Sequence, residues 1–332
     1  MAGVKALRSI QMGVETTAGT EADATTIWRG TGAIEDEQEV TFPEEDVGYL
    51  SGLDRTYIAK LGGTLEFESV PATFEQVSYL LNMGIASGST AADGSGSGVI
   101  WTHTAATTQG ATFDTYTLEM GDNQQFEVLT YGMAEELAFE GKAGEALMMG
   151  ATIRGQQPAN TTKTASLSVP SVEDVLFSKG KLYIDAVGGT MGTTQVTNSW
   201  LSMSMTIDTG RRAVWTADGN LYFSFDKQVM PEIVTEVTFE HDSFAVAAKT
   251  DARAQEARQL RMEWEGTAFT TAGTAYTYKT FRMDQVAKVE SFTAIEDEDG
   301  NDIITATFRA RYNDTAAKFF EALVVNTLSD LP

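Results

Sequence analysis

Several stretches of this chain alternate apolar and polar residues with a period of two, and this feature constrains the fold most. Residues 64–69, 116–120 and 236–240 all have the pattern. Such alternation is typical of strands with one buried and one solvent-exposed face. Thr, Val, Tyr and Phe, which favour pleated and half-buried surfaces, occur throughout the chain. Because long stretches with the helical period of 3.6 residues are absent, we expect a mainly β protein with few helices.

Three short segments do have a helical pattern. Residues 73–83 begin with a capping box formed by Thr73 and Gln76, followed by one apolar stripe. Residues 250–261 are more polar, and residues 315–325 predict a C-terminal docking helix. We expect all three to pack as ordinary flanking helices.

Three long connections separate the alternating stretches. Residues 43–61 mix charged residues with Tyr and Leu, and residues 86–98 form a flexible excursion rich in Gly and Ser. Residues 156–168 are polar and have no periodicity, which is typical of a linker between domains. A length of 332 residues is likewise enough for about two domains.

The chain repeats short motifs at a spacing close to half its length. Residues 151–154 (Ala-Thr-Ile-Arg) recur as residues 306–309 (Ala-Thr-Phe-Arg), and each motif closes an expected hairpin. Residues 65–68 recur as residues 237–240, an offset of 172. The order of elements around these motifs is the same in both halves, which predicts an internal duplication.

The chain contains few of the residue types that catalytic sites commonly use. The chain has no Cys, which excludes disulfides, thiolate metal sites and cysteine nucleophiles, and it has two His. A formal net charge of −24 argues against a free-standing nucleic-acid binder, which needs a basic surface. No apolar run approaches 18 residues, and the first 25 residues have no apolar signal region. We therefore expect no enzyme, cofactor, membrane span or secretory signal.

The remaining metal candidates have simpler interpretations. We expect His103 and His241 to be loop or strand-end residues, because no second histidine lies near either one. Residues 297–302 superficially resemble a calcium loop but lack its ligand spacing. Asp299-Gly300 instead predicts a tight turn at an acidic hairpin tip.

Four N-terminal segments carry a resemblance to a known family. They are residues 10–20 (Ile-Gln-Met-Gly-Val-Glu-Thr-Thr-Ala-Gly-Thr), 28–36, 42–48 and 72–76. Together they resemble the tail tube (major tail) proteins of long, non-contractile tailed bacteriophages, in the form with two tandem tube domains per chain. The segments cover about residues 5–85, and the two-copy layout extends the resemblance to the whole chain.

The resemblance implies a mainly β fold of two tandem tail-tube-type β-sandwich domains, each with a flanking short helix. Inner strands would form a continuous barrel on oligomerisation. The expected boundaries are an N-terminal arm at 1–28, the first tube domain at 29–160, a linker at 161–168, the second tube domain at 169–314 and a C-terminal helix or tail at 315–332.

The implied function is that of a structural virion protein which self-assembles into stacked rings. The rings would form the tail tube, an acidic-walled channel for genome passage, assembled in the host cytoplasm. Expected partners are copies of the same chain, the tape measure protein, and the tail terminator and tip proteins. DNA would pass without adhering, and no metal, cofactor or membrane is implied.

Duplication also predicts the size of the ring. Three chains supply six domains, so we expect trimeric, pseudo-hexameric rings. If each domain gives four inner strands, the ring has roughly twenty-four, with a backbone diameter of roughly 50 Å.

Two sets of residues are candidates for contacts in such a tube. An acidic channel wall repels DNA, and its candidates are Glu66, Glu68, Glu119, Glu135, Glu140, Glu145, Glu236, Glu240, Glu296 and Glu298. The loop over 43–61 is the candidate for stacking one ring on the next, through Glu44, Glu45, Asp46, Tyr49, Leu50, Arg55, Tyr57 and Lys60.

A second class of function stays open at this point. The chain could be a β-sandwich binding or decoration module of a phage tail or baseplate that recognises carbohydrate or protein. Trp28, Trp101, Trp200 and Trp215 would suit sugar stacking if they were exposed. The duplication and the long charged loops favour the tube.

Overall fold

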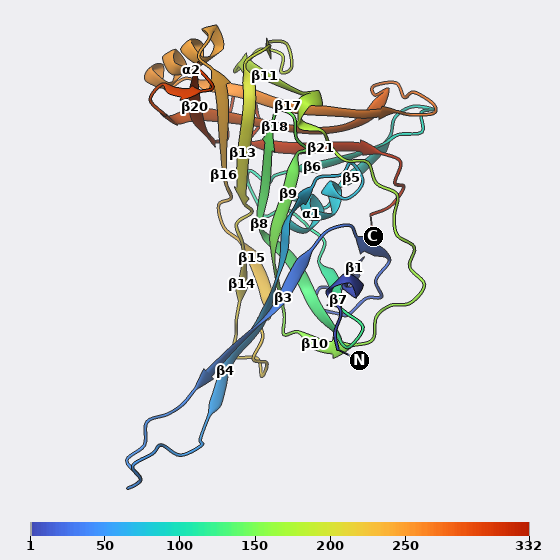
Figure 1. Cartoon of the computed structure of the whole chain (residues 1–332), viewed down its shortest axis with the longest axis vertical. Helices are drawn as coiled ribbons and strands as arrows, with labels where there is room; N and C mark the ends of the chain where they lie inside the picture. The colour runs from blue at the N-terminus through green and yellow to red at the C-terminus, as the bar shows by residue number, and fades with distance from the viewer. Residues whose placement is uncertain (1, 332) are drawn as a thin grey trace.

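A long antiparallel sheet, here called the main sheet, forms the centre of the computed structural model, which describes residues 2–331 (Figure 1). Its strands follow the order β3-β4-β9-β8-β13-β16-β20-β18. The bounds are β3 (Gly32–Thr41), β4 (Tyr57–Pro71), β9 (Met148–Gly155), β8 (Phe126–Lys142), β13 (Trp200–Asp208), β16 (Glu232–Glu240), β20 (Asn301–Ala310) and β18 (Tyr278–Phe292).

Shorter strands extend the two ends of the molecule. On the lower right of the body in Figure 1, above the tip of the β3–β4 hairpin, β8 also pairs with β7 (Tyr116–Gly121) and β10 (Ala159–Thr161), and β7 pairs with β1 (Ser9–Val14), which pairs with β2 (Thr26–Trp28). At the upper end, β18 continues into β17 (Ala257–Ala268), β11 (Gly180–Ala186) and β12 (Gln195–Val196) on one side. On its other side it pairs with β21 (Phe320–Asn326), which leads to β6 (Val99–Thr104) and β5 (Ser89–Ala92).

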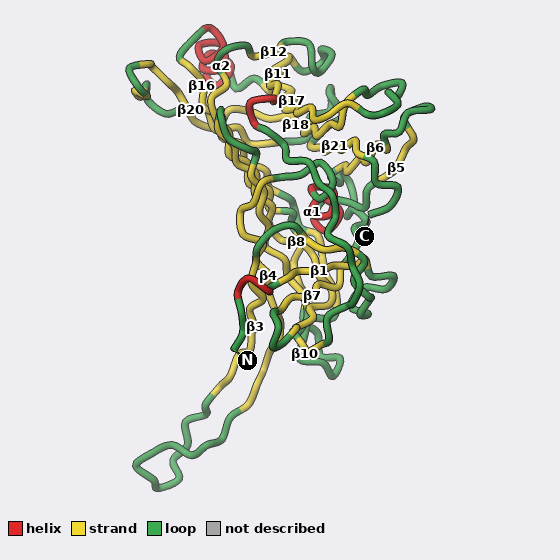
Figure 2. Tube along the Cα trace, turned by 45° about the vertical axis from the view of Figure 1, so that its right-hand side comes forward, coloured by secondary structure: helices red, strands yellow, loops and turns green. Residues whose placement is uncertain are grey.

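A few elements complete the described chain. They are the hairpin of β14 (Arg211–Val214) and β15 (Phe225–Gln228), β19 (Glu296–Glu298), the helices α1 (Val77–Gly84) and α2 (Ser243–Ala254), and the 3₁₀ turns η1 (Lys5–Leu7) and η2 (Phe177–Lys179). Figure 2 shows how strongly strands outweigh helices along the chain. The expectation of a mainly β protein is therefore confirmed.

One face of the main sheet packs on the core and the other is open. In β8, Leu137 and Phe139 are fully buried, whereas Glu136 and Glu140, which flank them, are exposed. Successive side chains of a strand point to opposite faces, so the apolar residues of the alternating pattern face the core and the polar residues face the open side. The helix α1 packs against β8 with all of its residues buried.

The first and second halves of the chain contribute strands in corresponding order. The pairs β3–β4, β4–β9 and β9–β8 correspond to β13–β16, β16–β20 and β20–β18. Each half also has a register shift at a corresponding place, after Ala134 in β8 and after Val289 in β18, 155 residues later. The motif at 151–154 lies in β9 and its counterpart at 306–309 lies in β20.

The ladders correct one detail of the repeat. Leu65 pairs with Ile153, and Thr235 pairs with Phe308, so the offset between β4 and β16 is 170 and not 172. A slip of two residues keeps every side chain on its face, so a match of apolar and polar positions alone does not detect it.

Of the three expected helices, one is displaced along the chain, one is a strand and one is confirmed in type. Instead of residues 250–261, α2 covers Ser243–Ala254, because the Asp242 carboxylate accepts hydrogen bonds from the backbone N–H groups of Phe244 and Ala245. Gln255 adopts the left-handed conformation and ends the helix, and β17 follows.

The expected helix at 315–325 is wrong, since residues 320–326 form β21. This strand lies between β18 and β6 and is almost entirely buried. A buried central strand has the same apolar run as a buried helix, so its partners decide its structure. The third helix, expected over 73–83, is confirmed in type but begins at Val77.

Hairpins replace part of the expected loops. Residues 86–98 include β5, which pairs with β6, and residues 57–61 belong to β4. The acidic tip at 297–302 is a hairpin between β19 and β20, in which Asp299 and Gly300 both have positive φ. The sequence predicts a tight turn there, and the two positive φ values show that it is of type I′.

The β8–β13 pairing gives a first test of this fold. Phe139 is fully buried in β8 and lies 5.8 Å, between ring centroids, from Phe281. We expect Phe139→Ala to lower the free energy of unfolding by about 3–5 kcal/mol, since it leaves a cavity. The neighbouring Glu140→Ala, on the open face, should change it by less than about 0.5 kcal/mol. Similar losses in the two variants, measured by urea denaturation, would contradict the assigned faces.

Candidate functional site

The open face of the main sheet is rich in carboxylates. Glu66, Thr152, Glu136 and Asp208 lie side by side in register across β4, β9, β8 and β13. A second row across β8, β13 and β16 contains Glu140, Ser204 and Glu236. Paired residues share one face of a sheet, so these carboxylates form a single acidic surface.

Ion pairs link strands across this surface at corresponding positions. Arg154 in β9 pairs with Glu37 in β3 and, at 3.3 Å, with Glu135 in β8. Arg309 in β20 pairs with Glu232 in β16 and, at 2.8 Å, with Glu290 in β18.

The two arginines are 155 residues apart, as are Glu135 and Glu290. The hydrogen bond from Arg309 lowers the pKa of the Glu290 carboxyl. Each cation thus neutralises part of the surface while joining three strands.

The predicted wall residues occupy several environments. Glu66, Glu140, Glu236 and Glu240 lie on strands of the main sheet with their side chains on the open face. Glu68 is exposed on β4 and accepts a hydrogen bond from Thr31. Glu145 is exposed in the connection between β8 and β9, and Glu296 is exposed in β19. Glu298 pairs with Lys142 at 2.8 Å.

Glu119 does not lie on this face. It is 3% exposed in β7, where its carboxylate accepts hydrogen bonds from the backbone N–H and the hydroxyl of Thr164. We therefore remove it from the wall set. The open face instead adds residues that sequence analysis missed: Glu35, Glu37, Glu136, Asp208 and Glu232. These residues are identified by the residues with which they pair on neighbouring strands.

The connection between β3 and β4 projects from the body as a long arm, defined here as residues 38–60 (Figure 1). Its large side chains are exposed: Phe42 and Tyr49 at 71%, with Leu50, Leu53 and Tyr57 also open to solvent. Glu44 and Asp46 are exposed as well, and Glu45 pairs with Arg55. Lys60 lies at the base of the arm, its Nζ 3.8 Å from the centroid of the Trp215 ring. The ring-stacking candidates therefore share one protruding element.

The β14–β15 hairpin corresponds to this arm in the second half of the chain, because it joins β13 to β16. It packs on the first half of the chain. Trp215 Nε1 donates to the Leu61 carbonyl at 3.2 Å, and Phe223 is fully buried against Tyr131, with ring centroids 4.8 Å apart. Arg211 donates to the Ala111 carbonyl at 2.9 Å beside the end of α1.

The tryptophans do not form an exposed stacking surface. Trp28 and Trp101 are buried, and Trp200 packs against Phe177 and Trp264. Trp215 is half-buried under Lys60. The aromatic set proposed for carbohydrate stacking is therefore absent from the surface of the described residues.

Neither histidine belongs to a cluster of metal-ligating side chains within the described residues. His103 is fully buried in β6 with Nδ1 2.9 Å from the Ala86 carbonyl oxygen, and His241 follows β16. Within residues 2–331, no three His, Asp or Glu side chains gather in a way that could hold a metal ion. No helix in this range is both long and apolar enough to cross a membrane.

Comparison with known proteins does not assign this chain to a family. Neither a scan against protein-family models nor a search of curated proteins finds a match to this sequence. The functional argument therefore depends on the geometry described above.

Burial of His103 predicts a pH dependence of stability. Loss of solvation lowers the pKa of His103 to about 4, against 6.5 in the unfolded chain. Between these values the unfolded state binds the proton and the folded state does not. This contribution is therefore complete above pH 6.5 and is lost as the pH falls towards 4, at up to about 1.4 kcal/mol per pH unit.

Urea denaturation between pH 4 and 7 measures this contribution. His103→Gln keeps a donor for the Ala86 carbonyl but removes the titrating ring. We expect a shallower fall of the unfolding free energy in the variant. Equal slopes in the variant and the parent would contradict the assignment.

Proposed function

We propose that this chain is a structural protein that closes into rings and stacks them into a phage tail tube. Each chain supplies two tandem tube domains, and the main sheet is their inner layer. The observation that carries the proposal is the join between β8 and β13, which pairs the first half with the second through seven successive residues, Glu136–Lys142 with Ser202–Asp208.

The corresponding strands at the two ends of the main sheet have free edges. By correspondence of the halves, β8 matches β18 and β13 matches β3. The strand β3 pairs only with β4 among residues 2–331, and β18 has no partner on its outer edge beyond Lys288. A join of β18 to β3 of a neighbouring chain would repeat the β8–β13 join and continue the sheet.

Closure of such a sheet removes both free edges, which otherwise template aggregation. Eight strands per chain give twenty-four strands in a ring of three chains, matching the size expected from duplication. The core-facing layers then lie outside, and the open acidic face lines the channel.

An acidic wall suits the passage of DNA. Duplex DNA carries one negative charge per roughly 1.7 Å of axis, and a basic wall would bind it through counterion release. The open face has carboxylates on β3, β4, β8, β13, β16 and β18, and the cations Arg154 and Arg309 each contact two of these carboxylates. The surface therefore stays net negative and repels the polyanion.

The tip of the arm suits ring stacking. Tyr49 and Leu50 are exposed at the tip, and Glu45 pairs with Arg55 on the same arm, as in a polar-rimmed contact with apolar anchors. The arm also extends beyond the body along the direction of β3 and β4 (Figure 1). It could therefore reach the adjacent ring.

A pair of matched substitutions tests ring closure. Ile295 is 49% exposed just beyond β18, on the edge proposed to receive β3, whereas Val246 is 51% exposed on α2. We expect Ile295→Asp to remain folded by circular dichroism but to lose rings in negative-stain images. Val246→Asp should assemble as the parent does, into rings whose mass corresponds to three chains. Normal rings from Ile295→Asp, or rings of six chains, would contradict the proposal.

Charge neutralisation tests the channel wall. Replacing Glu66, Glu140, Glu236 and Glu240 with Gln removes four charges per chain from the open face. We expect tubes to form and genome ejection to slow, most clearly at low salt where screening is weakest. The matched control converts Glu21, Glu256, Asp314 and Asp330, all exposed and outside the main sheet, to their amides. Equal ejection rates for both variants at every ionic strength would contradict an acidic wall.

A further inference from the structure

We propose that the base of the arm in one chain packs against the second half of its neighbour within the same ring. The receiving surface is a hollow lined by Met230, Pro231, Arg311 and Tyr312, and its occupant is the arm of a second copy of this chain. This inference rests on the proposed ring and adds a lateral contact to it.

A contact of the same kind already exists within one chain, between its second half and its first half. The β14–β15 hairpin covers Lys60, Leu61 and Gln156 of the first half. Trp215 lies over Lys60, the backbone N–H of Leu61 donates to the Leu221 carbonyl at 2.9 Å, and Gln156 Nε2 donates to the Phe223 carbonyl at 3.1 Å. The same hairpin buries Phe223 completely.

The base of the arm matches that hairpin in its backbone pairing. Val40 pairs with Ile58 and Thr41 with Tyr57, whereas Arg211 pairs with Gln228 and Arg212 with Lys227. The offsets are 171 on the first strand and 170 on the second, as they are for Ile34 with Met205 and Leu65 with Thr235.

A shift of one residue in the ladder also precedes both hairpins. It falls between Glu39 and Val40 in the arm and between Asp208 and Arg211 in the second half. The arm is therefore the counterpart of β14–β15 at its base, with a longer tip.

The same offsets locate the counterpart of the covered surface. Lys60 and Leu61 correspond to Met230 and Pro231, and Gln156 corresponds to Arg311. In the second half this surface is open: Met230 is 74% exposed and Tyr312 is 49% exposed.

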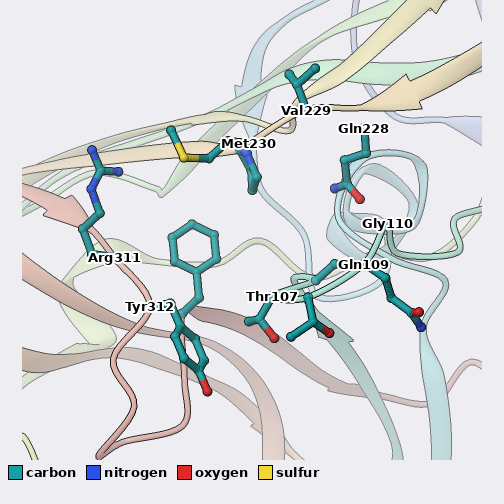
Figure 3. Close-up of a pocket in the computed structure, with 12 residues that line it drawn as sticks. Thr107, Gln109, Gly110, Gln228, Val229, Met230, Arg311 and Tyr312 are labelled. Atoms are coloured by element: carbon teal, nitrogen blue, oxygen red, sulfur yellow. The ribbon is translucent and has the colours of Figure 1, made fainter.

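These side chains line a hollow of about 570 Å³. Figure 3 shows Arg311 and Tyr312 on one side of it, Thr107 and Gln109 on the other, and Met230 above. Nothing in residues 2–331 fills the place that β14–β15 fills in the first half.

The chemistry of the arm complements the hollow. Val40, Phe42 and Tyr57 are exposed apolar side chains near its base, facing a lining that includes Met230 and Tyr312. Glu44 is the counterpart of Trp215 by the same offset of 171, and acidic residues follow it. Arg311 makes no ion pair with any described residue, so a neighbour's carboxylates can supply its partner.

Cysteine cross-linking tests the contact directly, because the chain has no Cys of its own. Glu44 is the counterpart of Trp215 and Met230 is the counterpart of Lys60, and Trp215 and Lys60 are in contact within one chain. The double variant Glu44→Cys with Met230→Cys therefore places one cysteine on each side of the proposed contact between two chains. With a short bismaleimide, we expect assembled protein to give covalent oligomers that stop at the size of the ring on a denaturing gel. The pair Glu44→Cys with Val246→Cys is the matched control and should stay monomeric on that gel.

The pattern of products separates the alternatives. A ladder that extends beyond one ring would mean that the arm reaches Met230 of an adjacent ring, and it would overturn the lateral contact. Rings visible by negative stain without cross-links would overturn the contact and leave the ring intact. A chain that stays monomeric by light scattering at all concentrations would overturn the ring and this contact together.

Discussion

The backbone pairing of β8 with β13 is the interaction on which the rest of the structure depends. Seven successive pairs join the first half of the chain to the second, and they bury Leu137 and Phe139 beside Met205 and Ile207. Without this pairing each half would expose one more edge strand, and the open face would not be continuous. The acidic rows that continue from one half to the other and the position of the β14–β15 hairpin on the first half both follow from it.

The two remaining edges impose the next constraint. A ten-residue edge strand such as β3 is a hazard for a monomer, since its free N–H and C=O groups invite pairing with any other edge. The strand carries Glu35, Asp36, Glu37 and Glu39. Like charges facing one another destabilise a cross-strand pair, so two β3 edges pair poorly. The free edge of β18 beyond Lys288 carries one carboxylate, Glu290, which is already paired with Arg309, and this favours the pairing that continues the sheet.

The sequence predicts the parts of the fold that local pattern controls. Alternating residues identified the strands around Leu65 and Val237, and Asp299-Gly300 identified a turn, because period and turn residues are local properties. It failed at β21, where an apolar run fits a buried strand and a buried helix equally well until β18 and β6 enclose it. It also failed at Glu119, whose burial depends on Thr164, 45 residues away.

The candidate site could be predicted only in part for the same reason. Alternation marks which residues share a face within one strand, so Glu66 and Glu236 were found. It does not say which strands lie side by side, so Glu136 and Asp208 were missed although they pair directly. Register between distant strands is set by long-range backbone pairing, which no local pattern encodes.

The arrangement of charge on the open face follows from two opposed requirements. Carboxylates gathered on neighbouring strands repel one another and destabilise the sheet that holds them. Arg154 and Arg309 reduce this repulsion, because each one contacts carboxylates from two other strands, and both halves use the same position in the ladder. Full neutralisation would need a cation for every carboxylate, and the face instead keeps Glu66, Glu136, Glu140 and Glu236 without an ion pair among the described residues. A surface balanced in this way holds its strands together and stays acidic, which is the combination that the proposed channel for DNA requires.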